Sequence, residues 1–190
     1  MKARAALKAA TAEDHGRVDA LFARLDLAGL DDYRTFLCAQ AAAFLPIEVA
    51  LDAAGAATVF DDWPGRRRAD LLRADLDQLG APPLPPIAAP PLGDPAEIAG
   101  AVYVLEGSRL GGAFLKRALP PTAPRRFLDA PQPPGSWRKL LEKLETLLYR
   151  SEQLDSAARS ARRTFARFEA AGRHYLETDQ ACVKAIHGST

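Results

Sequence analysis

Long apolar stripes at helical spacing, separated by proline-rich stretches, are the feature that most constrains the fold of this chain. Between Tyr33 and Leu51, large apolar side chains recur every three or four residues, as on one face of a helix, and Pro46 lies inside this stripe. Alanine, leucine, arginine and glutamate dominate outside the proline-rich stretches, whereas β-branched residues are too sparse to build a sheet. The sequence therefore predicts an all-α fold.

A second stripe and a proline-rich connector follow. Residues 66–79 repeat the apolar spacing, and Gly80 is placed to end that helix. The segment 81–95, APPLPPIAAPPLGDP, has too much proline to be helical. At its end, Asp94 is expected to cap the next helix, with Pro95 at the first helical position.

Three more helical segments are expected in the second half of the chain. The helix that begins at Pro95 should run to Leu119, where another proline-containing loop starts. Ser136 should then cap a helix over WRKLLEKLETLLYR, residues 137–150. Two amphipathic stretches, 164–168 and 174–186, complete the pattern.

Composition favours one soluble domain. A length of 190 residues is enough to bury a single core, so residues 1–190 are expected to form one domain. The 25 basic and 24 acidic residues nearly cancel, which excludes the overall field that would recruit nucleic acid or an anionic membrane. Cys38 and Cys182 suggest neither a disulfide framework nor a CxxC metal site, and no apolar run approaches the roughly 20 residues of a membrane span. We expect a cytoplasmic protein without membrane insertion.

Three polar residues near the N-terminus are spaced to bind a metal-centred ligand. Asp19 stands one helical turn after His15, where its carboxylate can accept the imidazole N–H and leave the other nitrogen for a metal. In a continuous helix Lys8 would lie about 10 Å from His15, which suits a planar macrocycle ligated at its centre and charge-paired at its edge. A structural histidine and a solvated lysine are the alternatives. Thr11 also opens a capping-box pattern, TAED, which could start a new helix between them.

Four small residues interrupt an otherwise apolar helical segment. Each glycine among Gly107, Ser108, Gly111 and Gly112 lowers helix stability by roughly 1 kcal/mol relative to alanine. Glycine lets a helix kink or approach a flat group closely, and the Ser108 hydroxyl can bind ordered water there. The GxxxG spacing from Gly107 to Gly111 is equally typical of tight helix packing. Spacing alone leaves both interpretations open.

These two segments resemble the haem oxygenase family, especially its bacterial members. LKAATAEDHGRVDALF is similar to the proximal helix of that family, and YVLEGSRLGGAFLKR is similar to its glycine-rich distal helix. The segments YRTFLCAQAAAFLPIEVAL, RADLLRADLDQLG, SWRKLLEKLE and ARRTFARF fall in the family's order and spacing. The resemblance covers most of the chain and implies a single-domain, multihelical haem oxygenase-like bundle.

The same resemblance implies roles for individual residues. Haem would lie between the two helices, with His15 as the proximal iron ligand and Asp19 as its orienting partner. Asp19 is shorter than the glutamate of many relatives, so its contact with His15 is expected to be weak or to pass through water. The distal wall would consist of Gly107, Ser108, Gly111 and Gly112. The other pocket residues implied are Lys8, Tyr103 and a basic residue of the helix carrying Lys139 and Lys143, at the propionates, and Phe165, an aromatic lining the pocket.

The activity that the resemblance implies is oxidative opening of haem to biliverdin, iron and carbon monoxide, with haem as both cofactor and substrate. A neutral histidine ligand gives less electronic push toward O–O cleavage than a thiolate, which leaves the porphyrin itself as the group to be oxidised. On the distal side, residues 103–114 offer only Glu106, Ser108 and Arg109 as polar side chains besides the tyrosine that begins them. The reaction would use O2.

An external electron donor is implied as well, because the sequence has no flavin or nicotinamide fingerprint. A ferredoxin, a flavodoxin or a reductase would serve. The basic residues that could dock an acidic donor are Arg117, Arg125, Arg126, Arg138 and Lys139. Simple solvated charge explains them at least as well.

Three other classes of protein fit parts of the pattern. A haem carrier or sensor would keep His15 and the pocket without turnover, and a haem-free interaction protein would use the glycines for helix packing. A di-iron enzyme ranks last, since EDH at 13–15 and ETD at 177–179 lack the required ExxH spacing. His174 and His187 are expected to be exposed, although either could ligate iron if the C-terminal segment folded over the pocket.

Overall fold

The computed structural model describes residues 2–81, 88, 90–132 and 134–187, apart from the side chains of Ala113 and residues 178–187. Across these residues the regular structure is helical and contains no strand, as predicted. The elements are α1 (Lys2–Ala10), α2 (Ala12–Phe22), α3 (Leu30–Ala53), α4 (Ala56–Val59), the short 3-10 helix η1 (Trp63–Arg66), α5 (Ala69–Gln78), α6 (Pro95–Leu115), α7 (Ser136–Leu147) and α8 (Ser151–His187).

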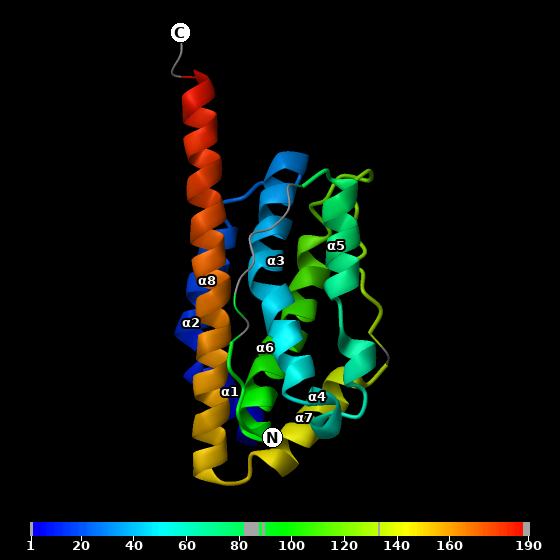
Figure 1. Cartoon of the computed structure of the whole chain (residues 1–190), viewed down its shortest axis with the longest axis vertical. Coiled ribbons are helices and arrows are strands. Elements are labelled where there is room, and N and C mark those ends of the chain that lie inside the picture. The colour runs from blue at the N-terminus through cyan, green and yellow to red at the C-terminus, as the bar shows by residue number, and fades with distance from the viewer. Residues whose placement is uncertain (1, 82–87, 89, 133, 188–190) are drawn as a thin grey trace.

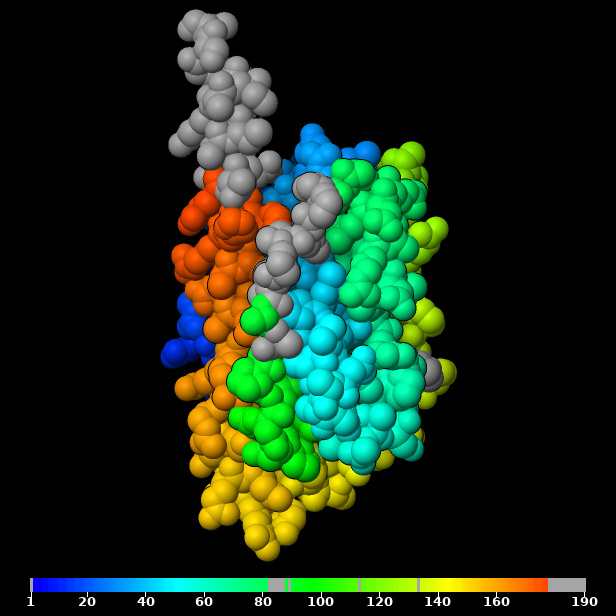
Figure 2. Space-filling model, in the orientation of Figure 1, coloured from blue at the N-terminus to red at the C-terminus, as the bar shows by residue number. Residues whose placement is uncertain are grey.

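The central helix is α3. Figure 1 shows α8, α3 and α5 alongside one another, with α1 and α2 behind α8 and α7 across the lower end; α6 starts between α8 and α3 and then passes behind α3. The space-filling view in Figure 2 shows α8, α3, α5 and the first turns of α6 on this face of the bundle. By length and composition α3 could cross a membrane, but 72% of its apolar window is buried by the other helices. It is therefore the core helix of a soluble protein.

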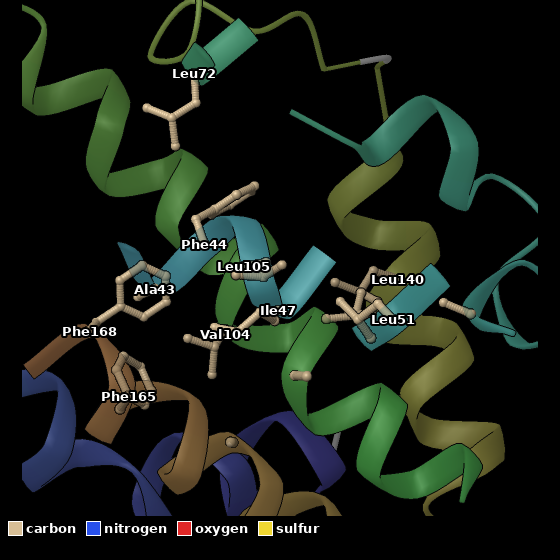
Figure 3. Close-up of a cluster of buried hydrophobic side chains, with 14 of the residues drawn as sticks. Ala43, Phe44, Ile47, Leu51, Leu72, Val104, Leu105, Leu140, Phe165 and Phe168 are labelled. Carbon is tan, nitrogen blue, oxygen red and sulfur yellow. The ribbon is translucent and has the colours of Figure 1, made fainter. Parts of the chain in front are cut away.

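One cluster of buried apolar side chains joins the long helices. Phe44 and Ile47 of α3 and Leu105 of α6 are at most 2% exposed. Figure 3 shows Phe165 and Phe168 of α8 approaching this cluster from the other side, next to Val104. Because α3, α6 and α8 share this core, their relative positions are fixed where they meet.

Two predicted helix boundaries are confirmed. Gly80 has the positive φ of +60° that a helix-ending glycine adopts, and the N–H of Ala81 bonds back to the Leu76 carbonyl. Asp94 caps α6, because its Oδ1 accepts from the N–H groups of Ala96 (2.7 Å) and Glu97 (2.9 Å). Pro95 takes the first helical position, as expected. Within the connector, residues 82–87 and 89 lie outside the described residues.

Four predicted boundaries are wrong, one each at α5 and α6 and two at α7. The helix expected from Arg66 begins only at Ala69, because the Glu48 side chain of α3 accepts the N–H groups of Arg68 and Ala69 and so caps α5 there. The helix expected to reach Leu119 ends at Leu115, ahead of the prolines at 120 and 121, which disfavour helical backbone before them.

At α7, Ser136 is the first helical residue rather than the cap. Gly135 occupies the cap position with a φ of +80°, and no side chain caps the helix. The Ser136 carbonyl instead accepts a hydrogen bond from Arg66. The helix ends at Leu147, so residues 148–150 lie beyond it.

The two C-terminal stretches are one continuous helix, α8, which contradicts the prediction of separate segments. Two small residues let other helices approach it closely. A Cβ on Gly100 of α6 would lie 2.1 Å from the Ala157 carbonyl oxygen, and a Cβ on Gly172 would lie 2.6 Å from Leu21 Cδ2 of α2. The Gly100 contact is with backbone and leaves no room for a side chain, whereas the Leu21 side chain beside Gly172 can shift. Helix α8 is thus the support on which α6 and α2 rest.

Candidate functional site

His15 lies on α2 with its imidazole 62% exposed. Its Nδ1 is 2.9 Å from Asp19 Oδ2, so the contact is direct rather than weakened or mediated by water. The ring also meets the edge of Phe165 on α8, at 5.6 Å between centroids. Since Asp19 engages Nδ1, Nε2 remains as the nitrogen available to a metal.

Lys8 is separated from His15 by a break between α1 and α2 at Thr11. A new helix does begin after Thr11, as the TAED pattern allowed, but Thr11 has φ −114° and ψ 5° and its side chain makes no capping hydrogen bond, so the capping box itself is absent. Its hydroxyl is buried and donates to the Leu7 carbonyl at 2.8 Å, one turn back, which satisfies it locally. Lys8 is exposed and makes no ion pair within the described part of the chain.

The glycines of α6 line an open face. The helix continues without interruption through Gly107, Ser108, Gly111 and Gly112. A Cβ added to Gly107 or Gly111 would meet no atom within 4 Å, whereas one on Gly112 would contact Leu128 Cδ2 at 3.2 Å. Tight helix packing therefore does not explain Gly107 and Gly111. That role belongs to Gly100, which lies outside the glycine-rich motif.

Large apolar side chains share this open face. With 100° of rotation per residue, Leu110 and Phe114 fall on the same side of α6 as Gly107 and Gly111. Leu110 is 53% exposed and Phe114 is 71% exposed. Exposed large apolar groups beside bare backbone are unfavourable in water, so this face is suited to an apolar, flat ligand.

The open face of α6 and the imidazole of His15 lie at the same level of the bundle. Figure 1 shows that α6 and α8 run in the same direction, and they touch where Gly100 meets Ala157. About two turns further along α6 stands Gly107, and about two turns further along α8 stands Phe165, which contacts His15. The structure thus brings the predicted proximal and distal segments to one region.

The other predicted pocket residues differ in their surroundings. Tyr103 is half-buried and stacks on Trp137 at 6.1 Å; burial raises the pKa of its phenol, and the nearby Arg4 opposes that shift. Phe165 is buried to 9% exposure beneath His15. Lys139 pairs with Asp61 at 3.1 Å, in the turn between α4 and η1. Lys143, one turn after it on α7, is exposed and forms no ion pair among the described residues.

A buried charge network behind α6 was not foreseen from the sequence. Glu106, 1% exposed, accepts from Arg66 Nη1 at 2.7 Å and from Arg109 Nε at 2.8 Å. Arg66 also pairs with Asp62 at 2.7 Å, and Arg109 donates to the Arg66 carbonyl. The charged side chains of this part of α6, Glu106 and Arg109, therefore form ion pairs on the side away from Gly107 and Gly111. Glu106 inside an apolar helix was the available signal, because a buried carboxylate needs a cationic partner.

Arg68 was missed as well. It is 3% exposed, and its Nη2 donates to the Leu105 carbonyl at 2.6 Å and to Ser108 Oγ at 2.9 Å. The Ser108 hydroxyl in turn donates to the Leu105 carbonyl at 2.7 Å. In the run of three arginines at 66–68, the sequence shows only charge, and nothing in it separates the two buried members from the exposed Arg67.

Outside this region the described residues contain no group of three histidine, cysteine, aspartate or glutamate side chains that could bind a metal ion. His174 is exposed, as predicted, and the side chain of His187 lies outside the described residues.

Comparison with known proteins gives a consistent result. No family model matches the chain. A curated haem oxygenase of Xanthomonas campestris pv. campestris is 35% identical over 112 residues, which cover 56% of this chain and 67% of the relative. The crystal structure of the NO- and CO-bound haem oxygenase from Neisseria meningitidis is similar with a TM-score of 0.75 and 27% identity over 90% of each chain.

Proposed function

This chain belongs to the haem oxygenase family and degrades haem, and from that premise we propose that His15 is the proximal iron ligand and that the glycine face of α6 is the distal wall. The observation that carries the assignment is the bare backbone at Gly107 and Gly111, at the level of an exposed imidazole whose Nδ1 is already bound by Asp19. The backbone at these glycines leaves room for a flat ligand, because no protein atom outside the helix lies within 4 Å of a Cβ added to either one.

The surrounding residues fit the rest of a haem molecule. Phe165, Leu110 and Phe114 offer apolar contact to the macrocycle. Lys8 and Tyr103 are retained as propionate contacts, and the observed pairing of Lys139 with Asp61 favours Lys143 over Lys139 as the basic residue of α7.

The chemistry is that of the substrate: with O2 and external electrons, bound haem is opened to biliverdin with release of iron and carbon monoxide. The chain's own contribution is positional. Asp19 fixes the orientation and tautomer of His15, because a carboxylate on Nδ1 directs Nε2 to the ligand. On the distal side, Glu106 and Arg109 are bound to each other and to Arg66, so no charged side chain of that turn competes for protons over the glycines.

The electron donor and the cell compartment belong to the same proposal. An acidic ferredoxin, flavodoxin or reductase would dock on the exposed cations Arg117 and Arg126. Three of the five basic residues first considered already have local partners: Arg125 donates to the Pro120 and Pro121 carbonyls, Arg138 faces Glu142 and Lys139 faces Asp61. We place the protein in the cytoplasm as one domain, in keeping with its single hydrophobic cluster and its buried free Cys38.

The test begins with one equivalent of hemin added to the purified protein, to His15→Ala and to His174→Ala. His174 is the matched control, because it is an exposed histidine further along α8. We expect the wild type and His174→Ala to give the same Soret band, which His15→Ala loses or shifts. Ascorbate or a ferredoxin system in air should then convert the band into biliverdin absorbance. A stable complex that several donors cannot degrade would identify a carrier or sensor, and absence of specific binding would contradict the haem assignment.

A further inference from the structure

Arg68 is buried between two aromatic rings, where the ring faces attract its guanidinium but the loss of hydration opposes the charge. Its guanidinium carbon lies 4.8 Å from the ring centroids of both Phe44 and Phe127, which meet edge to face around it. Burial, reinforced by the nearby Arg109, lowers the pKa of Arg68 to about 9. A methionine or leucine would fill this space without the penalty of desolvating a charge. Packing alone therefore does not account for an arginine here.

The hydrogen bonds of Arg68 set it apart from its neighbours. Arg66 and Arg109 both pair with the Glu106 carboxylate, as buried arginines usually do. Arg68 makes no ion pair among the described residues, and its buried Nε has no hydrogen-bond partner there. Its side-chain hydrogen bonds both end on α6, at the Leu105 carbonyl and the Ser108 hydroxyl.

Those two acceptors flank Gly107 on the anchored side of α6. The glycine-rich turns have low intrinsic helix stability, and their open face offers no protein atoms to pack against. Their position must therefore be set from behind. Arg68 is placed to do this, because it joins the loop after η1 to α6 at the residues on either side of Gly107.

We infer that Arg68 is a positioning residue for haem degradation: it fixes the glycine-rich turns of α6 by binding the Leu105 carbonyl and Ser108 hydroxyl, and so sets the hydrogen-bonding environment opposite His15. The inference rests on the proposed function. It assigns Ser108 to this anchoring contact, with its hydroxyl directed to Leu105 and Arg68.

The decisive variants are Arg68→Met, Arg68→Lys and Ser108→Ala, with Arg67→Met as the control. Methionine keeps apolar volume between the two phenylalanines, and Arg67 is the exposed neighbour, paired with Asp52 at 3.2 Å. We would measure four quantities for each protein. They are the thermal unfolding temperature without haem, the hemin affinity, the single-turnover rate, and the pH midpoint at which the absorption spectrum of the ferric hemin complex changes. The last quantity reports hydrogen bonding on the distal side and does not follow from stability.

For Arg68→Met we expect unchanged or higher thermal stability, hemin affinity within about threefold of wild type and a single-turnover rate lower by about tenfold or more. The pH midpoint should shift by about half a unit or more. Arg68→Lys should restore part of the single-turnover rate and part of the pH midpoint. Adding Ser108→Ala to Arg68→Met should cause no further loss of rate, because the two residues act as one unit. Arg67→Met should match wild type.

A folded Arg68→Met with wild-type rate and pH midpoint would overturn the inference. If Arg68→Met does not fold, Ser108→Ala decides: a slower rate with a shifted midpoint supports the anchoring contact, and wild-type behaviour contradicts it. Failure of the wild type to bind or degrade hemin would instead contradict the proposed function, so the two failures are distinguishable.

Discussion

At the scale of single residues, the pair of His15 and Asp19 is exposed, with 62% and 65% of their side chains accessible. A hydrogen-bonded pair this exposed adds little to folding stability, because water screens it and competes for both groups. Its value lies in fixing the direction in which Nε2 points. Asp19 should therefore matter to ligand binding and hardly at all to the stability of the haem-free protein.

Replacing Asp19 by alanine tests this separation. We expect hemin affinity to fall by about tenfold to a hundredfold, the range typical for loss of a residue that orients a metal ligand. The free energy of unfolding without haem should change by less than about 0.5 kcal/mol. Hemin titration and urea unfolding give the two quantities, with Asp31→Ala as the control, since Asp31 is an exposed aspartate on α3. A loss of unfolding free energy as large as the loss of hemin-binding free energy would contradict the proposed role of Asp19 in orienting His15.

The glycines of α6 give a matched pair of substitutions. Gly107→Ala should leave the haem-free protein as stable or more stable by up to about 1 kcal/mol, because the added methyl group enters open space and favours the helix. It should weaken hemin binding, since the methyl group occupies the ligand's position. Gly100→Ala should do the reverse and destabilise the fold, because its Cβ would lie 2.1 Å from the Ala157 carbonyl oxygen. Thermal unfolding with and without hemin separates these effects.

At the scale of elements, the segment 116–135 is attached to α5 by one carboxylate. Asp75 is fully buried, and its two oxygens accept the N–H groups of Arg126 (3.1 Å) and Phe127 (2.8 Å). Phe127 in turn packs on Arg68. This attachment links the loop after α6 to the residue that we assign to positioning the helix.

Asp75→Ala should lower the free energy of unfolding by about 2–6 kcal/mol, because one buried and one partly buried N–H group lose their acceptor at about 1–3 kcal/mol each. Urea unfolding measures the loss. Asp77→Ala is the control, since Asp77 is exposed two residues further along the same helix. A similar small effect from both substitutions would show that water replaces the Asp75 carboxylate.

The elements also show where sequence patterns suffice. Asp94 and Gly80 were predicted correctly, because a cap or a left-handed glycine depends on residues that are neighbours in the chain. Ser136 was assigned wrongly because Gly135 takes the cap position beside it. The two C-terminal stretches belong to one helix, α8, and Gly172 lies inside it beside the Leu21 side chain of α2. Such contacts between distant segments leave no periodic signal in the sequence.

At the scale of the whole molecule, Glu97 links the start of α6 to α8. It accepts the Gly93 N–H at 2.7 Å and pairs with Arg163, and these contacts lower the pKa of its carboxyl below the ordinary value of 4.5. A lowered pKa in the folded state means that this contribution to stability is present above pH 4.5 and is lost as the pH falls through the folded-state pKa.

Glu97→Gln should therefore lower the melting temperature at pH 7 by roughly 2–4 °C, for a loss of about 1 kcal/mol. The gap between variant and wild type should narrow below pH 4.5. Calorimetry across this range measures it, with Glu142→Gln, an exposed glutamate on α7, as the control. If the difference in melting temperature between variant and wild type stays constant with pH, the ionised form of Glu97 is not the source of the stabilisation.

The candidate site was only partly predictable at this scale. The identities of His15, Asp19 and the glycines followed from local spacing and from a family resemblance, and the structure brings these segments to one level of the bundle. The buried contacts of Arg66 with Glu106 and of Arg68 with the Leu105 carbonyl join segments about forty residues apart. Whether an arginine side chain is exposed to water or forms buried hydrogen bonds depends on the tertiary structure, so the sequence alone does not show it.

The contact between Gly100 and Ala157 has a consequence for the distal wall. This contact sets how far α6 stands from α8, and α8 also supports α2, which carries His15. The separation of the two walls therefore depends in part on Gly100, a residue outside the pocket that meets the Ala157 backbone. A side chain at Gly100 would push α6 away from α8 and so disturb the position of the distal wall without changing His15, Asp19 or the residues of the glycine face.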